Sequence, residues 1–256
     1  MKPKFFSRVL KKVATLIFPK SKVVSKTPIK DEPAVYLCNH SGAIGPSIMT
    51  LYFPKPHKTW IIGYVLDKEK APNFIFNDFF FGRSKRCKWF WRILSKIVAK
   101  ILRPLLEYGN PIPVYHDRRM IETFRLSLDT LLEGKDLVVF PECPTRYSEF
   151  INSFYTGFAD MGRTYYAATG KDLAFYPVYV EKKNRVISVG EPVFYDHTKP
   201  PHAQRDFITE KIRDAIDGLA RELPEHKPVP FLPKVWYDYY GEYENDPASY
   251  WRTFDK

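Results

Sequence analysis

Three clusters of polar side chains each follow an apolar stretch of this 256-residue chain, and their types suit proton transfer and anion binding. A histidine can accept a proton from a hydroxyl, and the planar fork of an arginine can pair with two phosphate oxygens at once. Such groups together favour a site for a phosphate-bearing substrate that must lose a hydroxyl proton. The clusters are Asn39-His40-Ser41, His116-Asp117-Arg118-Arg119, and Glu142 with Thr145 and Arg146.

The sequence predicts that strands and helices alternate along the chain. Apolar runs bounded by turn residues indicate strands, and apolar residues at helical spacing indicate helices. The expected strands are 33–39, 58–65, a short one within 111–119, 136–142, 173–181 and 185–190. The expected helices are 46–53, 88–109, 120–135, 153–169 and 203–222.

This order predicts an α/β fold with a largely parallel central sheet and helices on both of its faces. In such sheets, ligands bind outside the carboxyl ends of the strands. The three polar clusters fall at strand ends of this kind, which makes His40, between a buried strand and a glycine-containing loop, the candidate general base.

The composition indicates a globular protein with an acidic partner. Hydrophobic residues make up 45% of the chain and charged residues 27%, while the formal net charge is +11. That charge suits nucleic acid, an anionic membrane, or phosphorylated and CoA-like substrates. We find no base-reading motif, so nucleic acid is disfavoured.

Cysteine spacing and hydropathy narrow the class of protein further. Cys38, Cys87 and Cys143 lack CxxC-type spacing, which fits a reducing compartment and predicts neither a disulfide framework nor a metal site. The sequence contains no run of 18 apolar residues, so no membrane-spanning helix is predicted. The first 20 residues lack the pattern of a signal peptide. We therefore expect a cytoplasmic protein.

Two segments combine an apolar side with a basic side at helical spacing. In residues 4–18, where termini seldom belong to a core, we favour a helix that lies on a membrane. In residues 88–109 the same pattern fits either a membrane-surface helix or a helix packed on the core. The basic stripe of the second segment comprises Lys88, Arg92, Lys96, Lys100 and Arg103, and its apolar stripe comprises Phe90, Ile93, Leu94, Ile97, Val98, Ile101 and Leu105.

Four short blocks resemble those of the glycerolipid acyltransferase superfamily, which includes the 1-acylglycerol-3-phosphate acyltransferases. The blocks are "NHSGAIG", "IPVYHDRR", "VVFPECPTR" and "FYPVYV", and they occur in the family's order over about residues 33–195. The resemblance implies transfer of a fatty acyl group to a lysophospholipid or glycerophosphate hydroxyl at the inner face of the cell membrane. It implies acyl-CoA or acyl carrier protein as the donor and no cofactor.

The resemblance also implies a role for each site residue. His40 matches the family's base, and Asn39 and Ser41 beside it are expected to bind the substrate. Glu142, Thr145 and Arg146 match the block that holds the acceptor. Either His116 or Arg118 occupies the family's arginine position, depending on the alignment, and Arg118 or Arg119 would serve the phosphate.

Two departures from the family pattern concern the site directly. Gly45 stands where the family has the aspartate of its His-x4-Asp motif, so the base lacks its usual orienting partner; Glu142, Asp117 and Asp78 are candidates to replace it. The Glu142 block carries one extra residue, with Cys143-Pro144 in place of glycine. Cys143 reads either as an acyl-accepting nucleophile or, as we favour, as a buried thiol.

The sequence therefore predicts three regions and two alternative functions. Residues 1–20 form a membrane-surface helix, 21–223 an acyltransferase-like domain with an insertion at about 54–108, and 224–256 an aromatic-rich tail. The favoured function is a peripheral membrane acyltransferase of phospholipid biosynthesis. The alternative is a catalytically impaired lipid-binding or scaffolding protein that keeps the fold.

Overall fold

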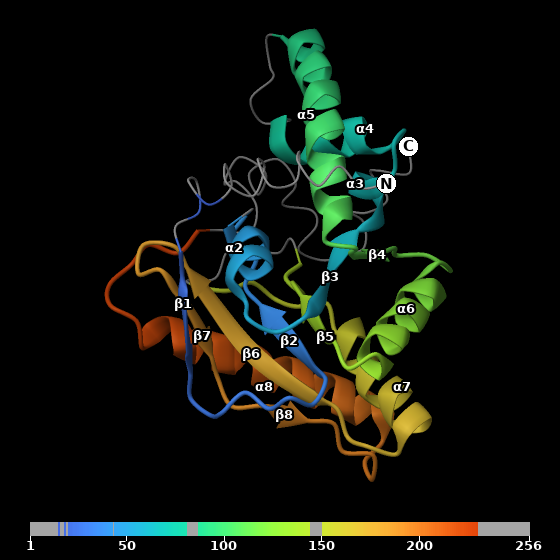
Figure 1. Ribbon diagram of the computed structural model, residues 1–256, viewed down its shortest axis with the longest axis vertical. Coiled ribbons are helices and arrows are strands. Elements are labelled where there is room, and N and C mark those ends of the chain that lie inside the picture. Colours follow the sequence, from blue (N-terminus) through green and yellow to red (C-terminus); the bar gives the residue numbers. More distant parts are fainter. Residues whose placement is uncertain are drawn as a thin grey trace.

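The computed structural model describes residues 15, 18, 20–42, 44–80, 87–143 and 150–229. These residues form an eight-stranded sheet in the order β1-β7-β6-β2-β5-β3-β4, with β8 paired to β6 (Figure 1). The strands are β1 (Lys22–Ser25), β2 (Ala34–Cys38), β3 (His57–Ile62), β4 (Ile112–Val114), β5 (Asp136–Val139), β6 (Ala174–Glu181), β7 (Val186–Val189) and β8 (Val193–Phe194).

The five central strands β6, β2, β5, β3 and β4 run parallel to one another. β7 and β8 pair antiparallel with β6, and β1 pairs parallel with β7 at the edge. The predicted class, an α/β fold with a largely parallel sheet, is confirmed by this pairing. Continuously buried strands such as β2 are expected in a parallel sheet that is covered on both faces.

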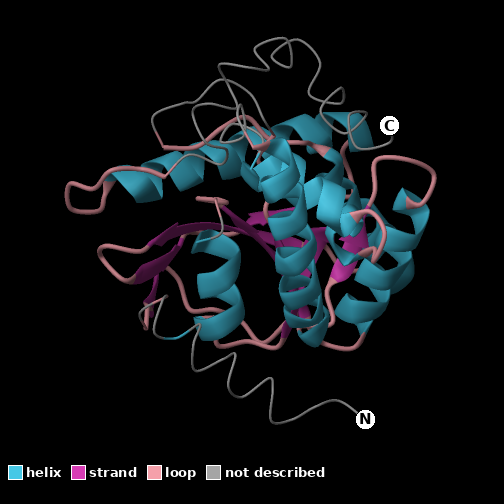
Figure 2. Ribbon diagram, turned by 90° about the horizontal axis from the view of Figure 1, so that it is seen from above, coloured by secondary structure: helices cyan, strands magenta, loops and turns pink. Residues whose placement is uncertain are grey.

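Helices cover both faces of the sheet, as Figure 2 shows. On one face, Ile208 and Ile212 of α8 (Pro201–Arg221) share a core with Val35 and Leu37 of β2. On the other face, Ile48 of α2 (Ile44–Tyr52) packs with the alternate residues of the same strand. Successive side chains of a strand point to opposite faces, so β2 contributes to both cores.

A buried ion pair fixes the amino-terminal ends of the central strands. Lys55 Nζ lies 3.0 Å from the carboxylate of Asp136, at the start of β5. The same carboxylate accepts a hydrogen bond of 2.9 Å from the backbone N–H of Ala34, at the start of β2. This pairing sets the register of the two strands that lead to the candidate site.

A helical subdomain follows β3 directly. It comprises α3 (Gly63–Leu66), α4 (Ala71–Ile75), the π-helix Phe76–Phe80 and α5 (Lys88–Tyr108), and its own apolar cluster includes Tyr64, Ile75 and Ala99. Figure 1 shows α5 extending beyond the sheet, on the side toward which the parallel strands run. Within the described part of the chain, no helix is both long and apolar enough to cross a membrane.

Some elements have other boundaries than the sequence predicts. The strand expected over 58–65 ends at Ile62, and α3 begins at the next residue, Gly63. The helix expected over 153–169 begins only with a 3-10 turn at Gly157–Ala159 and continues as α7 (Asp160–Thr169). Residues 151–156 form no helix because Phe154 bridges Glu142 instead. α6 (Met120–Leu132) lies within its expected segment.

The division into three regions stays a prediction. Residues 1–14, 16, 17 and 19 of the amino-terminal segment and residues 230–256 of the tail lie outside the described part of the chain.

Candidate active site

The loop that carries His40 turns back on itself by means of two residues with left-handed backbone. Ser41 has φ 46° and Gly42 has φ 61°, directly after the carboxyl end of β2. Glycine adopts this region without strain, whereas a serine there needs local support. That support includes a 2.7 Å hydrogen bond from Asn39 Nδ2 to the Ser41 hydroxyl.

The turn brings the carbonyl oxygen of Gly42 to Nδ1 of the His40 ring, and the two atoms are hydrogen-bonded. A carbonyl oxygen only accepts, so Nδ1 must carry the proton. In the neutral ring the other nitrogen, Nε2, then holds the lone pair. The backbone thus selects the tautomer that a general base needs.

Burial lowers the pKa of His40 from its ordinary 6.5 to about 4, because the interior penalises the charged ring more than the Gly42 hydrogen bond favours it. The imidazole is therefore neutral at pH 7. Its ring also meets the ring of Phe140 edge-on, with 5.4 Å between centroids. Such packing restricts the ring to one orientation.

Glu142 is buried and binds backbone rather than the His40 ring. Its Oε1 accepts from the N–H of His40 at 2.5 Å, and its Oε2 accepts from the N–H of Asn152 at 3.2 Å. Burial raises the pKa of Glu142 to about 7, although both hydrogen bonds oppose the rise. This carboxylate joins the His40 loop to the Pro-Glu corner and to the segment that follows it.

The loop geometry accounts for Gly45, where the resembled family has aspartate. A Cβ at this position would lie 2.4 Å from the carbonyl oxygen of Asn39 and 2.7 Å from that of His40. Both distances are far below contact distance, so no side chain fits unless the loop moves. Gly45 N–H donates to His40 O at 3.1 Å, which holds the start of α2 against the loop.

Asn39 and Ser41 hold the loop in place. The amide of Asn39 donates to Val180 O at 3.1 Å and accepts from Val180 N at 2.7 Å, as a neighbouring strand residue would. Both side chains are buried. Their contact with substrate, expected from the resemblance, stays a prediction.

The second cluster approaches the Pro-Glu corner through Tyr155. The His116 ring packs against the Tyr155 ring with 5.4 Å between centroids, and Tyr155 N–H donates to Pro141 O at 2.8 Å. Nothing in the sequence marked Tyr155, because its approach depends on chain that returns after the undescribed residues 144–149. The same is true of Asn152.

The two arginines of this cluster differ in their partners. Arg119 is bonded to Asp117 at 2.6 Å and lies over the Tyr115 ring, 3.9 Å from its centroid. Arg118 is exposed and forms no side-chain ion pair with any described residue. Of these two described arginines, Arg118 is therefore the one whose guanidinium is not paired with a carboxylate. Asp117 is engaged by Arg119.

Of the other candidate site residues, the structure describes the side chain of Cys143 but not those of Thr145, Arg146 and Asp78. Cys143 is buried, with Sγ 3.2 Å from Ser153 O, which is the arrangement of a packed thiol. Thr145, Arg146 and the side chain of Asp78 lie outside the described residues. Among the described residues, no group of three or more His, Cys, Asp and Glu side chains is arranged to hold a metal.

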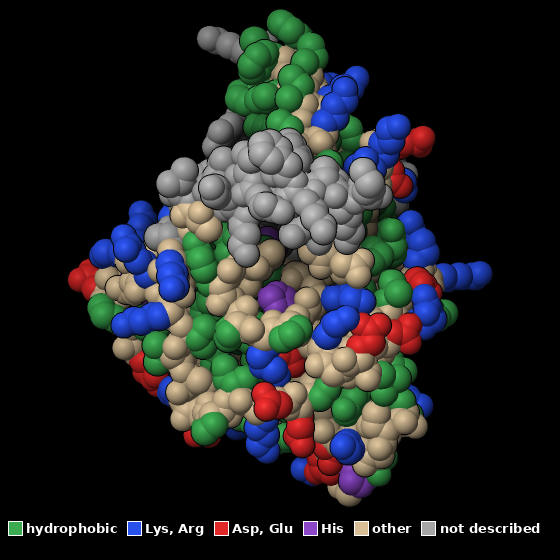
Figure 3. All heavy atoms as spheres, viewed as in Figure 1, with side chains coloured by type: hydrophobic (Ala, Val, Ile, Leu, Met, Phe, Trp, Pro, Cys, Tyr) green, Lys and Arg blue, Asp and Glu red, His purple; other side chains and the backbone are tan. Residues whose placement is uncertain are grey.

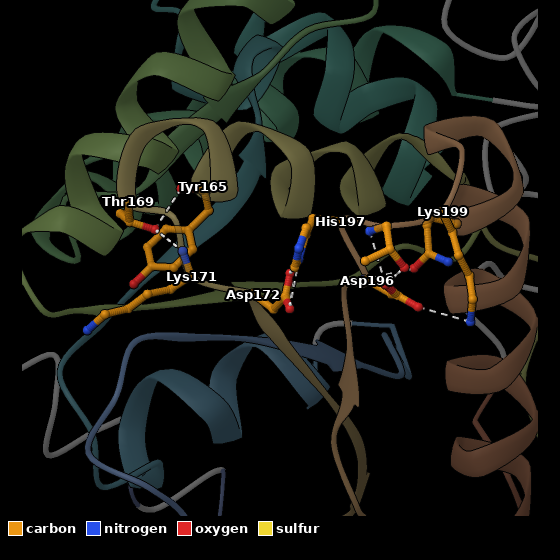
Figure 4. Close-up of polar contacts among 9 residues, drawn as sticks. Tyr165, Thr169, Lys171, Asp172, Asp196, His197 and Lys199 are labelled. Carbon is orange, nitrogen blue, oxygen red and sulfur yellow. Dashed lines mark hydrogen bonds and ion pairs between the residues drawn. The ribbon is translucent and has the colours of Figure 1, made fainter.

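A second histidine with a fixed partner lies at the other end of the sheet. Figure 4 shows His197 directed at Asp172, with Nδ1 3.1 Å from the carboxylate, and His197 also stacks on Tyr166 at 4.2 Å between centroids. Asp172 precedes β6, whereas His40 follows β2, which runs parallel to β6. The pair is exposed and ties α7 to the loop after β8.

Comparison with known proteins gives a distant structural likeness. No family model and no curated protein matches the sequence. Among solved structures, the chain is similar to the 1-acyl-sn-glycerophosphate (LPA) acyltransferase PlsC of Thermotoga maritima. The identity is 17% and the TM-score 0.47, over 87% of this chain and 83% of that one. We therefore derive the chemistry of the site from its own geometry.

Proposed function

We propose that the protein is an acyltransferase that moves a fatty acyl group from acyl-CoA or acyl carrier protein to a lysophospholipid or glycerophosphate hydroxyl. The observation that carries this proposal is the hydrogen bond between His40 Nδ1 and the Gly42 carbonyl. It leaves the lone pair of a neutral imidazole on Nε2, as a base requires. The four sequence blocks support the choice of reaction.

In this reaction Nε2 of His40 takes the proton from the acceptor hydroxyl as its oxygen attacks the thioester carbonyl. The tetrahedral intermediate then expels the thiolate, which receives the proton from the imidazolium. Glu142 positions His40 through its backbone N–H and is not a catalytic residue in this scheme. Arg118 would bind the acceptor phosphate.

The missing aspartate reduces the expected rate without removing the base. In the serine proteases, changing the orienting Asp to Asn lowers turnover about 10⁴-fold because the wrong tautomer results. Here a carbonyl oxygen holds the correct tautomer, so that part of the loss is avoided. What is lost is the negative charge that would stabilise the imidazolium. We therefore expect a slow enzyme.

The competing function is a lipid-binding or scaffolding protein that keeps the fold. The observation in its favour is that Gly45 excludes the carboxylate on steric grounds. A protein of this kind would bind lysolipid with no product formed.

The test incubates the purified protein with labelled acyl-CoA, or labelled acyl-acyl carrier protein, and a panel of lysolipids. We expect a diacyl product that His40→Ala abolishes. His197→Ala is the matched control, since it removes the histidine that has a carboxylate partner, and it should leave turnover unchanged. No product with any pairing, or equal loss in both variants, would favour the scaffolding function.

A further inference from the structure

Helix α5 has two apolar faces, and the protein buries only one of them. On the inner face Ser95 and Ala99 are buried, and Val98 and Leu102 pack with the cluster of α3 and α4. The outer face keeps its large side chains in solvent, each between 47% and 68% exposed. These outer residues are Trp89, Phe90, Ile93, Ile97 and Ile101.

The outer residues form one continuous row. Ile93, Ile97 and Ile101 follow each other at intervals of four, which places them on one side of the helix. From Trp89 to Ile101 the row is about 18 Å long, at 1.5 Å per residue. Figure 3 shows hydrophobic side chains gathered on the protruding part of the molecule over α5. Scattered exposed apolar residues are ordinary, but a contiguous row of this size marks an interaction surface.

A row of positive charge runs beside the apolar row. Lys88, Arg92, Lys96 and Lys100 also follow at intervals of four, and the 100° step of a helix places them between the two apolar faces. Lys88, Lys96 and Lys100 have no ion-pair partner among the described residues. Arg103 is paired with Glu107, the only acidic residue of α5, at 3.6 Å.

We propose that the outer face of α5 docks on an anionic lipid bilayer, with the apolar row in the interface and the basic row against the headgroups. The charge pattern separates this occupant from a second copy of the chain. Two outer faces packed together would bring rows of like charge close to each other, whereas anionic headgroups complement them. The projection of α5 beyond the sheet lets it reach a flat surface (Figure 1).

This inference rests on the proposed function only in that the acceptor lipid would lie in the same membrane. The docking face itself contains none of the site residues. Its failure and the failure of the catalytic proposal can therefore be distinguished.

The test measures sedimentation of the protein with phosphatidylcholine vesicles that contain or lack phosphatidylglycerol. The double variant Ile93→Glu/Ile97→Glu should lower the partition coefficient on anionic vesicles by about tenfold or more, because carboxylates enter the apolar row. Ile121→Glu is the matched control; this isoleucine is 78% exposed on α6 and should bind as the wild type does. Lys96→Gln/Lys100→Gln should lower binding to the anionic vesicles by roughly fivefold per charge.

Further measurements make each outcome decisive. Unchanged vesicle binding by Ile93→Glu/Ile97→Glu, with thermal unfolding like that of the wild type, overturns the proposal. Light scattering that shows a wild-type dimer, lost in this variant, also overturns it in favour of self-association. Turnover of a detergent-dispersed acceptor should persist in Ile93→Glu/Ile97→Glu, and His40→Ala should still bind vesicles. The two proposals thus fail through different variants.

Discussion

The backbone N–H of His40 donates to the buried carboxylate of Glu142 across 2.5 Å, and the two residues are 102 positions apart. Through this bond, the end of β2 and the corner after β5 are held as one unit. The turn at Ser41 and Gly42 sets the orientation of the imidazole ring. The bond between His40 and Glu142 sets the position of the loop that carries the ring.

Glu142→Gln should change how stability depends on pH. Because burial raises the pKa of Glu142 from 4.5 to about 7, the folded protein binds a proton more tightly than the unfolded chain does. The contribution of Glu142 to stability therefore falls as pH rises from about 4.5 to about 7, by about 3 kcal/mol. Glutamine does not titrate, so the free energy of unfolding of the variant should rise relative to wild type over that window.

Urea unfolding of both proteins at pH 5 and pH 8 checks this expectation. The titration of His40 is common to both and cancels in the difference. Glu191→Gln, at an exposed site, serves as the control for the exchange of a glutamate for a glutamine. A difference that is flat with pH would show that Glu142 is not perturbed as described.

Gly45→Ala should destabilise the protein by about 2 kcal/mol or more. The added methyl group would overlap two carbonyl oxygens, and the loop must shift to relieve the contact. Gly218→Ala in α8 is the matched control, since an added Cβ there meets nothing within 4 Å. That substitution should stabilise the helix by up to about 1 kcal/mol. Chemical denaturation measures both.

Gly45→Asp should not raise turnover, although it restores the aspartate of the resembled family. The Cβ of an aspartate here would overlap the same two carbonyl oxygens as the Cβ of alanine. The carboxylate therefore cannot reach the His40 ring in the present loop conformation. An increase in turnover would mean that the loop adopts another conformation at no great cost.

The value of kcat/KM should change little as the pH falls below 6.5, the ordinary pKa of histidine. A general base must be neutral, and burial lowers the pKa of His40 to about 4. With a detergent-dispersed acceptor, kcat/KM should therefore persist as pH falls through 6.5 and decline only near pH 4. A decline near pH 7 that Glu142→Gln removes would belong to Glu142. A midpoint near 6.5 in both proteins would contradict the buried state of the ring.

Arg118→Ala should raise the KM for a phosphate-bearing acceptor by roughly 10- to 100-fold, since a hydrogen bond between charged groups is worth about 1.5–3 kcal/mol. Arg119→Ala breaks an exposed pair with Asp117 and should cost less than about 1 kcal/mol of stability, with little change in KM. An acceptor without phosphate should be insensitive to Arg118→Ala. The reverse ranking of the two arginines would assign the anion to Arg119.

Sequence reasoning anticipated the parallel sheet because a chain that alternates buried strands with amphipathic helices has few other ways to cover both faces. It also placed His40 and Glu142 at the carboxyl ends of strands of one sheet, since parallel strands end at one edge. That their strands β2 and β5 are neighbours is a finding of the structure. It did not identify Gly42 as the partner of the His40 ring. Three carboxylates were the candidates, and Glu142 instead binds the backbone N–H.

The sequence by itself determined which side chains are chemically competent, and it determined the apolar stripe and the basic stripe of residues 88–109. Only the tertiary structure decided how they are used. Apolar periodicity indicates that a helix face prefers to leave water, but it does not say which part of that face a neighbouring helix will cover. The packing of α3 and α4 against α5 decides that Val98 and Leu102 are covered and that Ile93, Ile97 and Ile101 stay exposed. The partner of His40 depends on two left-handed residues, whose φ values are fixed by the bonds that close the loop rather than by residue type alone.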